Sequence, residues 1–336
     1  MYKKITALAT LLALGSLPLQ SHVPSTQHAR VGQLEESVNH IGEHIYKSRH
    51  YMFSSRVPLG PTAKKRIAEL FEDTYAAGDA LAKILPIPRV QAYRKGGHFH
   101  ANLYASTRDF TANGGIEGSA GTYRTQRAVP TKWLSIPADD RPPLKERMLV
   151  RDYVALPFDS LGLNRRGRLV EPDIDSHVIV HEAIHQLIVL NNLPNWAEEG
   201  FAEYVSSLPL NQPKINFRQA YAVLVQRAKE SYNQRQLRCD FSLYEFFFLS
   251  QQDMYEKMAD GNVDTYGLAG MLIAFFLHMD GNRGVKALRA YMNARLRQSS
   301  AAADIQHLFA PYGGVAGLER AFLAAWRQHG VHVRFD

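Results

Sequence analysis

Near the start of the chain, apolar residues recur at the spacing of an α-helix. This period predicts an amphipathic helix over about 33–53, and Thr62 can cap a second helix that continues to Leu85. We therefore expect residues 22–85 to form an N-terminal helical region. The apolar positions are Leu34, Val38, Ile41, Ile45 and Met52 in the first helix, and Ile67, Leu70, Phe71, Leu81 and Leu85 in the second.

From Pro86 the pattern changes to short runs of alternating or β-branched residues divided by Gly, Asn and Pro. Such runs are typical of strands in a small sheet. An apolar helical stretch follows, and residues 86–206 are predicted to form an α+β domain. The predicted strands are Arg89–Arg94, Phe99–Ser106, Gly121–Thr125, Lys132–Ile136 and Met148–Leu156.

Beyond Tyr204 the helical period dominates, and residues 207–336 are predicted to form a mainly helical C-terminal lobe. The segment 264–279 is apolar almost all round, so we expect it at the centre of that lobe. The fold class is therefore α+β. The predicted helices are 217–230, 242–251, 264–279, 284–297 and 315–329, with Gly330 as a C-terminal stop.

The helix predicted over His177–Leu190 carries H-E-A-I-H at residues 181–185. Residues four apart lie on one helix face, so His181 and His185 can point two imidazoles at one ion. Glu182 then lies near the open coordination position, where the Glu of a metallopeptidase acts as general base. Because unpaired polar groups in an apolar helix cost several kcal/mol, a shared metal would satisfy all three.

Catalytic zinc needs a third protein ligand, and three glutamates follow just downstream. Asn195 is predicted to cap a helix, with Glu198 as its capping-box partner. That leaves Glu199 as the predicted third ligand. Glu203 is four residues further along the same face, where it can orient a ligand histidine through the other ring nitrogen.

Other histidines offer alternative ligands. His177 lies one turn before the motif, but three imidazoles in a row along one helix converge poorly on a tetrahedral ion, so we place it at the cleft edge. His40 and His44 are four apart but lack a nearby third ligand, and solvent exposure is expected. His98 and His100 share one face of a predicted strand, which is more often an ordinary strand face than a metal site.

The motif and the segment N-W-A-E-E-G-F-A-E-Y over 195–204 together resemble the gluzincins, zinc peptidases whose third ligand is a Glu on a following helix. The resemblance covers about residues 175–206 and implies a zincin-like fold with Zn2+ held by His181, His185 and Glu199. It implies Glu182 as the general base. The gap between the motif and the third ligand is shorter than in the aminopeptidases of this clan, and no G-A-M-E-N-like motif is present, which puts aminopeptidase activity in question.

The resemblance also suggests how a peptide would be held. In gluzincin-like folds a sheet strand runs along the cleft and pairs with the substrate backbone, and Gly118–Thr125 is the candidate here. A plain glycine-rich hairpin is the alternative. Tyr266 is the candidate for stabilising an oxyanion across the cleft, with a core tyrosine whose hydroxyl is satisfied as an equal alternative.

Residues 1–21 have the build of a secretory signal peptide: Lys3 and Lys4, the apolar run Ile5–Leu14, then small residues. The apolar run is too short to span a bilayer as a helix. We expect an exported protein, periplasmic or secreted. Loss of the two lysines takes the formal net charge from +7 to +5, a mild excess that fits association with anionic envelope polymers.

Two further features limit the chemistry. The short Arg165–Arg168 cluster lacks interleaved aromatics, so it indicates a solvated loop and no nucleic-acid partner. Cys239 is the only cysteine, which excludes an internal disulfide and a thiolate zinc cage. Its surroundings give a weak cue for a reactive thiol, and a structural role is expected.

The sequence therefore predicts an exported zinc-dependent metallopeptidase acting on protein or cell-wall peptides. One alternative is a catalytically silent zincin-like protein that binds a peptide or partner in the envelope. Another is a metal-free His–Glu network at a domain junction. The sequence leaves the substrate and the oligomeric state open.

Overall fold

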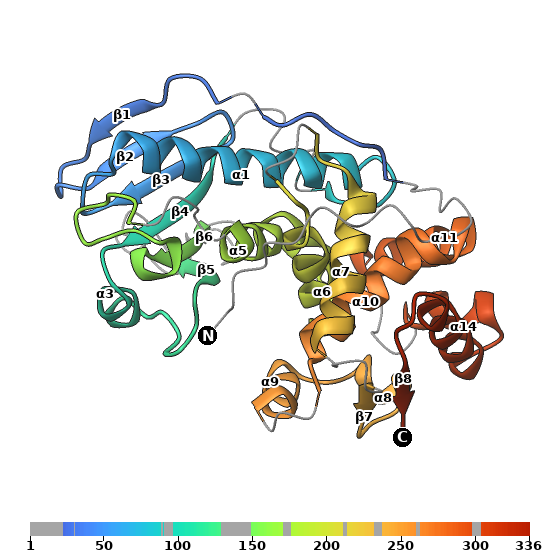
Figure 1. Cartoon of the computed structure of the whole chain (residues 1–336). Coiled ribbons are helices and arrows are strands. Elements are labelled where there is room, and N and C mark those ends of the chain that lie inside the picture. The colour runs from blue at the N-terminus through green and yellow to red at the C-terminus, as the bar shows by residue number, and fades with distance from the viewer. Residues whose placement is uncertain are drawn as a thin grey trace, which may run out of the picture.

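The computed structural model describes residues 23–29, 31–88, 90, 97–128, 149–170, 176–210, 214–231, 237–259, 263–297 and 304–336. The fold is α+β, as predicted: a mixed sheet with helices along it, followed by a mainly helical part (Figure 1). The predicted signal peptide, the predicted strand Lys132–Ile136 and most of Arg89–Arg94 lie outside the described residues. No helix among the described residues is both long and apolar enough to cross a membrane.

The main sheet has six strands in the order β1-β2-β3-β4-β6-β5. The first three are antiparallel, β3, β4 and β6 are parallel, and β5 runs antiparallel to β6 at one edge. The predicted strands at 99–106, 121–125 and 148–156 are thereby confirmed. The strands are β1 Glu35–Val38, β2 His44–Lys47, β3 Tyr51–Ser55, β4 Phe99–Tyr104, β5 Thr122–Ala128 and β6 Leu149–Pro157.

The helix predicted over 33–53 is wrong, because β1, β2 and β3 occupy that region. Side chains alternate along β3, and its core residues are Tyr51 and Phe53. By contrast, Val38 and Ile41 of the supposed apolar stripe are 60% and 64% exposed. The helical spacing came from residues on either side of a turn, which is closed by Gly42 at a φ of 80°.

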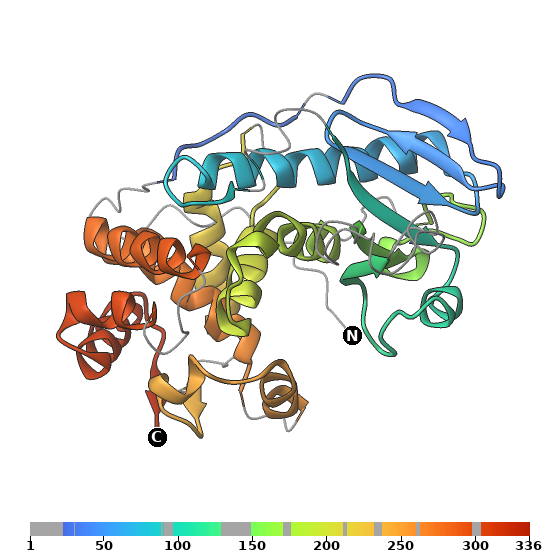
Figure 2. The same ribbon diagram turned by 180° about the vertical axis from the view of Figure 1, so that it is seen from behind.

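The second predicted helix is confirmed as α1, Pro61–Leu81. It begins with Pro61 after Gly60, so Thr62 lies inside the helix rather than capping it. Figure 2 shows α1 running along the sheet and over α5, Ser176–Ile188. The helices approach closely at Gly78, where a Cβ would lie 2.6 Å from Leu187 Cδ1. This packing fixes the H-E-x-x-H helix beside the sheet.

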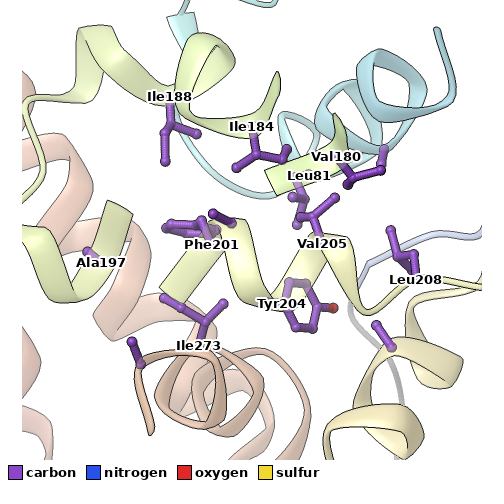
Figure 3. Close-up of a cluster of buried hydrophobic side chains, with 14 of the residues drawn as sticks. Leu81, Val180, Ile184, Ile188, Ala197, Phe201, Tyr204, Val205, Leu208 and Ile273 are labelled. Atoms are coloured by element: carbon purple, nitrogen blue, oxygen red, sulfur yellow. The ribbon is translucent and has the colours of Figure 1, made fainter. Parts of the chain in front are cut away.

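Two glycines set the spacing between α6, Asn195–Ser206, and α10, Thr265–Ala274. A Cβ on Gly200 would lie 2.7 Å from the Ala269 carbonyl oxygen, and one on Gly270 would lie 3.0 Å from Glu203 Cβ. Figure 3 shows the other contacts of α6, with Ile184 and Ile188 of α5 on one side and Ile273 of α10 on the other. The helix is thus held between α5 and α10 in a fixed rotation.

The predicted helices 217–230, 264–279, 284–297 and 315–329 are confirmed, although the last turn of 264–279 is a π-helix, η5 Phe275–Met279. The prediction 242–251 is wrong in part: α8 ends at Phe246 and a separate helix starts at Gln251. The remaining elements are α3 Thr107–Ala112, η3 Phe158–Leu161, η4 Val189–Asn191, α7 Phe217–Ser231, β7 Leu237–Cys239, α8 Leu243–Phe246, α9 Gln251–Ala259, α11 Gly281–Leu296, α13 Gln306–Phe309, η6 Ala310–Tyr312, α14 Val315–Gln328 and β8 Val333–Phe335.

Candidate metal centre

Helices α5 and α6 bring three ligand side chains to one point. His181 Nε2 lies 3.1 Å from Glu199 Oε2, and His185 Nε2 lies 3.6 Å from the same oxygen. One atom from each of the three residues lies within 4.8 Å of the others, so this group could hold a metal ion. The structure therefore places together the two histidines and the glutamate that the sequence singled out.

The group is largely buried, with side-chain exposures of 12% for each histidine and 7% for Glu199. Burial alone would lower the pKa of His181, but the Glu199 and Glu203 carboxylates on either side of its ring raise that pKa well above the usual value. Although burial opposes its charge, the two histidines lower the pKa of Glu199 to about 2. The carboxylate is thus ionised at neutral pH, and a metal must compete with protons for the imidazoles.

Two buried atoms of this group lack a satisfactory hydrogen bond among the described residues: Glu199 Oε2 and His181 Nδ1. The oxygen lies 3.1 and 3.6 Å from the two imidazole Nε2 atoms without a hydrogen bond to either. A buried anionic oxygen in that position is costly unless a cation or donor satisfies it. Two imidazoles and a carboxylate are also a common catalytic zinc ligand set, so the residues fit a zinc ion.

Glu203 lies on the opposite side of the His181 ring from Glu199. Its Oε1 is 3.2 Å from His181 Nδ1, and its Oε2 is 3.4 Å from both His177 Nε2 and Arg227 Nη1. Burial opposes the charge, but contacts with His177 and His181 lower the pKa of Glu203. An ionised carboxylate at Nδ1 can hold the ring so that Nε2 is the ligand atom.

His177, His181 and Glu203 form a second group with ligand atoms close enough for a metal. It shares His181 with the first group, so the two sites compete for one ring. The Arg227 guanidinium, 3.4 Å from the Glu203 carboxylate, would also repel a second cation. The first group is therefore the candidate centre, and His177 lies beside it.

The capping box predicted from Asn195 and Glu198 is wrong. The helix begins one residue earlier, because the Pro194 carbonyl accepts the backbone N–H groups of Ala197 and Glu198. The Asn195 side chain instead donates to the Leu249 carbonyl at 3.1 Å. Glu199 still faces α5, because the rotation of α6 is set by its packing rather than by this cap.

The edge strand β5 starts beside Glu182. A Cβ on Gly121, the residue before β5, would lie 2.6 Å from Leu156 Cδ2 and 3.1 Å from Glu182 Cγ. Only glycine lets the backbone pass so close to the predicted general base. Of the predicted segment 118–125, residues 122–125 therefore lie in an edge strand that begins beside Glu182, and residues 118–121 precede it as irregular structure.

Tyr266 stands in the first turn of α10, with its ring centroid 6.3 Å from that of His181 and the planes nearly parallel. It is half-buried, so it borders the site rather than lying in the core. Burial, followed by the nearby Glu199, raises the pKa of Tyr266, and its hydroxyl hydrogen-bonds with Gln251. The phenol is thus a hydrogen-bond donor at neutral pH.

The other candidates do not join a metal group within the described ranges. His40 and His100 are exposed, as are Arg165, Arg166 and Arg168. Cys239 is buried, and burial followed by the Asp240 and Asp336 charges raises its pKa to about 12, which fits a structural cysteine.

Sequence reasoning missed Arg227 and Gln251, which come from α7 and α9 and carry no motif of their own. Both reach the centre through tertiary packing: Arg227 through Glu203, and Gln251 through Tyr266. Comparisons with family models, with curated proteins and with solved structures found no match to this chain. The geometry of these side chains is therefore the basis for a functional proposal.

Proposed function

We propose that the protein is a zinc-dependent metallopeptidase that hydrolyses peptide bonds. The ligands are His181, His185 and Glu199, and Glu182 is the general base. The single observation behind this assignment is the position of one Glu199 oxygen within 3.1 and 3.6 Å of the two imidazole Nε2 atoms. A His2Glu set leaves a fourth position open, as catalysis requires.

When bound, zinc supplies a Lewis acid and lowers the pKa of a coordinated water to about 7. Glu182 takes a proton from the attacking water and passes it to the leaving nitrogen of the peptide. The Glu203 carboxylate lies 3.2 Å from His181 Nδ1, where its charge favours the ring orientation that leaves Nε2 for the metal. Arg227 Nη1 lies 3.4 Å from Glu203 Oε2 and helps to hold that carboxylate in place.

The substrate is proposed to bind along β5. The strand is at the edge of the sheet, where its backbone can pair with an extended peptide. Gly121 brings this edge next to Glu182. Tyr266, whose ring stacks on that of His181 with the centroids 6.3 Å apart, would donate a hydrogen bond to the oxyanion.

The arrangement supports a zincin-like fold as part of the proposal, since a mixed sheet whose edge strand β5 is antiparallel to β6 lies beside the H-E-x-x-H helix. With the predicted signal peptide, export to the periplasm or the medium would make envelope proteins and cell-wall peptides the available substrates.

The test uses protein purified without chelator or nickel resin. We expect about one zinc per chain by elemental analysis, and cleavage of a cell-wall peptide mixture or a generic protein substrate. Glu182→Gln should retain zinc and lose turnover. Glu230→Gln makes the same chemical change at an exposed position on α7 and should keep both.

Three results would contradict the proposal in different ways. Protein with zinc but no cleavage that depends on Glu182 would indicate a silent binding protein. Absence of bound metal, even after incubation with zinc, would indicate a metal-free ion-pair network. Equal cleavage by the parent and Glu182→Gln would exclude the assigned base.

A further inference from the structure

A tight turn at 164–168 presents three arginines in a fixed arrangement. The Asn164 side-chain oxygen accepts the backbone N–H groups of Arg166 and Arg168, both at 3.0 Å. Two backbone hydrogen bonds close the turn, Asn164 N–H to the Arg168 carbonyl and Gly167 N–H to the Asn164 carbonyl, both at 2.9 Å. The side chains of Arg165, Arg166 and Arg168 are exposed.

The turn is docked against the segment that leads into α1. Gly60 N–H donates to the Gly167 carbonyl at 2.8 Å, and a Cβ on Gly167 would lie 2.3 Å from the Pro58 carbonyl oxygen. Arg56, also exposed, is two residues before Pro58. Four arginines therefore gather at one end of the protein. Among the described residues none of them forms an ion pair with a carboxylate.

Exposed apolar side chains accompany these arginines. Val170, two residues after the turn, is 66% exposed. In the sheet register, His44 pairs with Ser55, so the β1–β2 connection with the exposed Ile41 lies next to Arg56. In Figure 1 this connection and the 162–170 loop both lie at the left end of the molecule, and in Figure 2 both lie at the right end.

Two described carboxylates near this end contact other groups rather than the arginines. Glu36 is paired with Lys64, and Glu43 accepts a hydrogen bond from the Asn39 amide at 3.0 Å. Arginines beside protruding aliphatic side chains match an interface between water and anionic lipid, where headgroups attract the guanidinium groups and the acyl boundary accepts the apolar groups. A soluble polyanion would contact the arginines but leave the apolar groups in water.

We propose that this arginine end docks on the surface of a bilayer that contains anionic phospholipid. It comprises Ile41, Arg56, Arg165, Arg166, Arg168 and Val170. The docking is independent of the metal centre, since none of these residues belongs to it. It would hold the protein against a membrane with α11 and α14 at the opposite side of the molecule (Figure 1).

The test is sedimentation of the full chain with vesicles of phosphatidylcholine alone or mixed with phosphatidylglycerol. We expect binding only to the mixed vesicles, weakened by added salt. The triple variant Arg165→Ser, Arg166→Ser, Arg168→Ser should bind about 100-fold more weakly, since each arginine near the surface contributes a factor of about five. The matched control removes three exposed charges at the other end, Arg320→Ser, Arg327→Ser, Arg334→Ser, and should change binding little.

A second pair of variants tests the apolar part. Ile41→Ser with Val170→Ser should weaken vesicle binding and leave heparin binding unchanged. The thermal unfolding midpoint of each variant is measured, and the single variants Arg165→Ser and Arg168→Ser replace the triple one if it is unfolded. The proposal is overturned if the parent does not bind mixed vesicles, or if both triple variants lose binding equally. It is also overturned if the protein binds heparin and the Ile41→Ser, Val170→Ser variant binds vesicles like the parent. That last result would indicate a soluble polyanion as the partner.

Discussion

Glu203→Gln is the sharpest test of how the metal centre is held together. The substitution keeps the shape of the side chain but removes the charge that faces His181 Nδ1 at 3.2 Å. It also removes the ionic partner of Arg227 and His177, each 3.4 Å from the other carboxylate oxygen. Because the three ligands stay in place, zinc should still bind, but less tightly.

The expected loss is about 10- to 100-fold in zinc affinity, the usual effect of removing a group that orients a ligand. That corresponds to about 1.4–2.8 kcal/mol. The measurement is a competition titration of the metal-free protein against a chromophoric zinc chelator at a fixed pH. The unfolding midpoint of the metal-free variant is recorded alongside, so that a loss of fold is not mistaken for a loss of ligand orientation.

Glu198→Gln supplies the matched control on the same helix. Glu198 lies one residue before the proposed ligand. Burial raises its pKa, His185 opposes that rise, and the Glu199 charge adds to it. It makes no ion pair among the described residues, so zinc affinity should stay within about twofold of the parent. Equal affinity of Glu203→Gln and the parent, or a larger loss in Glu198→Gln, would refute the assignment of the two carboxylates.

Three further predictions concern packing, catalysis and pH. Gly200→Ala should reduce the free energy of unfolding by about 1–3 kcal/mol in urea denaturation, because the new Cβ would lie 2.7 Å from the backbone of α10. Gly32→Ala is the control and should leave this free energy unchanged, because no atom lies within 4 Å of its Cβ position. Tyr266→Phe should lower kcat by about 10²- to 10³-fold and leave zinc affinity unchanged, if the phenol donates to the oxyanion; equal turnover would exclude that role. In the metal-free protein, the raised pKa of His181 stabilises the fold at low pH, and this stability is lost as the pH rises from about 6.5 through the pKa of His181 in the folded state. The lowered pKa of Glu199 stabilises the fold at higher pH, and this stability is lost as the pH falls from about 4.5 towards 2. The free energy of unfolding, measured by urea denaturation of the metal-free protein at a series of pH values, should therefore be greatest between about pH 4.5 and 6.5. The variant Glu199→Gln should abolish this pH dependence.

The side-chain group that could hold a metal was predictable from sequence because its spacing is local to two helices. Four residues separate His181 from His185, and Glu199 from Glu203, so the helical period alone puts each pair on one face. The cap that was used to choose Glu199 was wrong, yet the choice agrees with the geometry. What places that residue against α5 is the packing of α6 between α5 and α10, where Gly200 allows close approach.

Residues that join the centre through tertiary contacts could not be predicted. Arg227 is 24 residues beyond Glu203 in sequence, and Gln251 belongs to a helix whose start was misplaced. Neither has a spacing that relates it to the motif. Only the folded chain shows that one holds the carboxylate behind His181 and the other holds Tyr266.

The error at 33–53 has a different cause and connects the fold to the arginine end. The stripe that predicted a helix included Val38 and Ile41, which are exposed in the structure. The buried residues of this region are Tyr46, Tyr51 and Phe53 on the adjacent strands β2 and β3. A periodicity count treats every apolar residue as buried. An apolar side chain that contacts a membrane is counted in the same way, although it does not face the protein core. Its position therefore need not follow the spacing of the residues that are buried in the fold. Vesicle binding that depends on Ile41 would therefore explain both the exposed side chains and the wrong prediction.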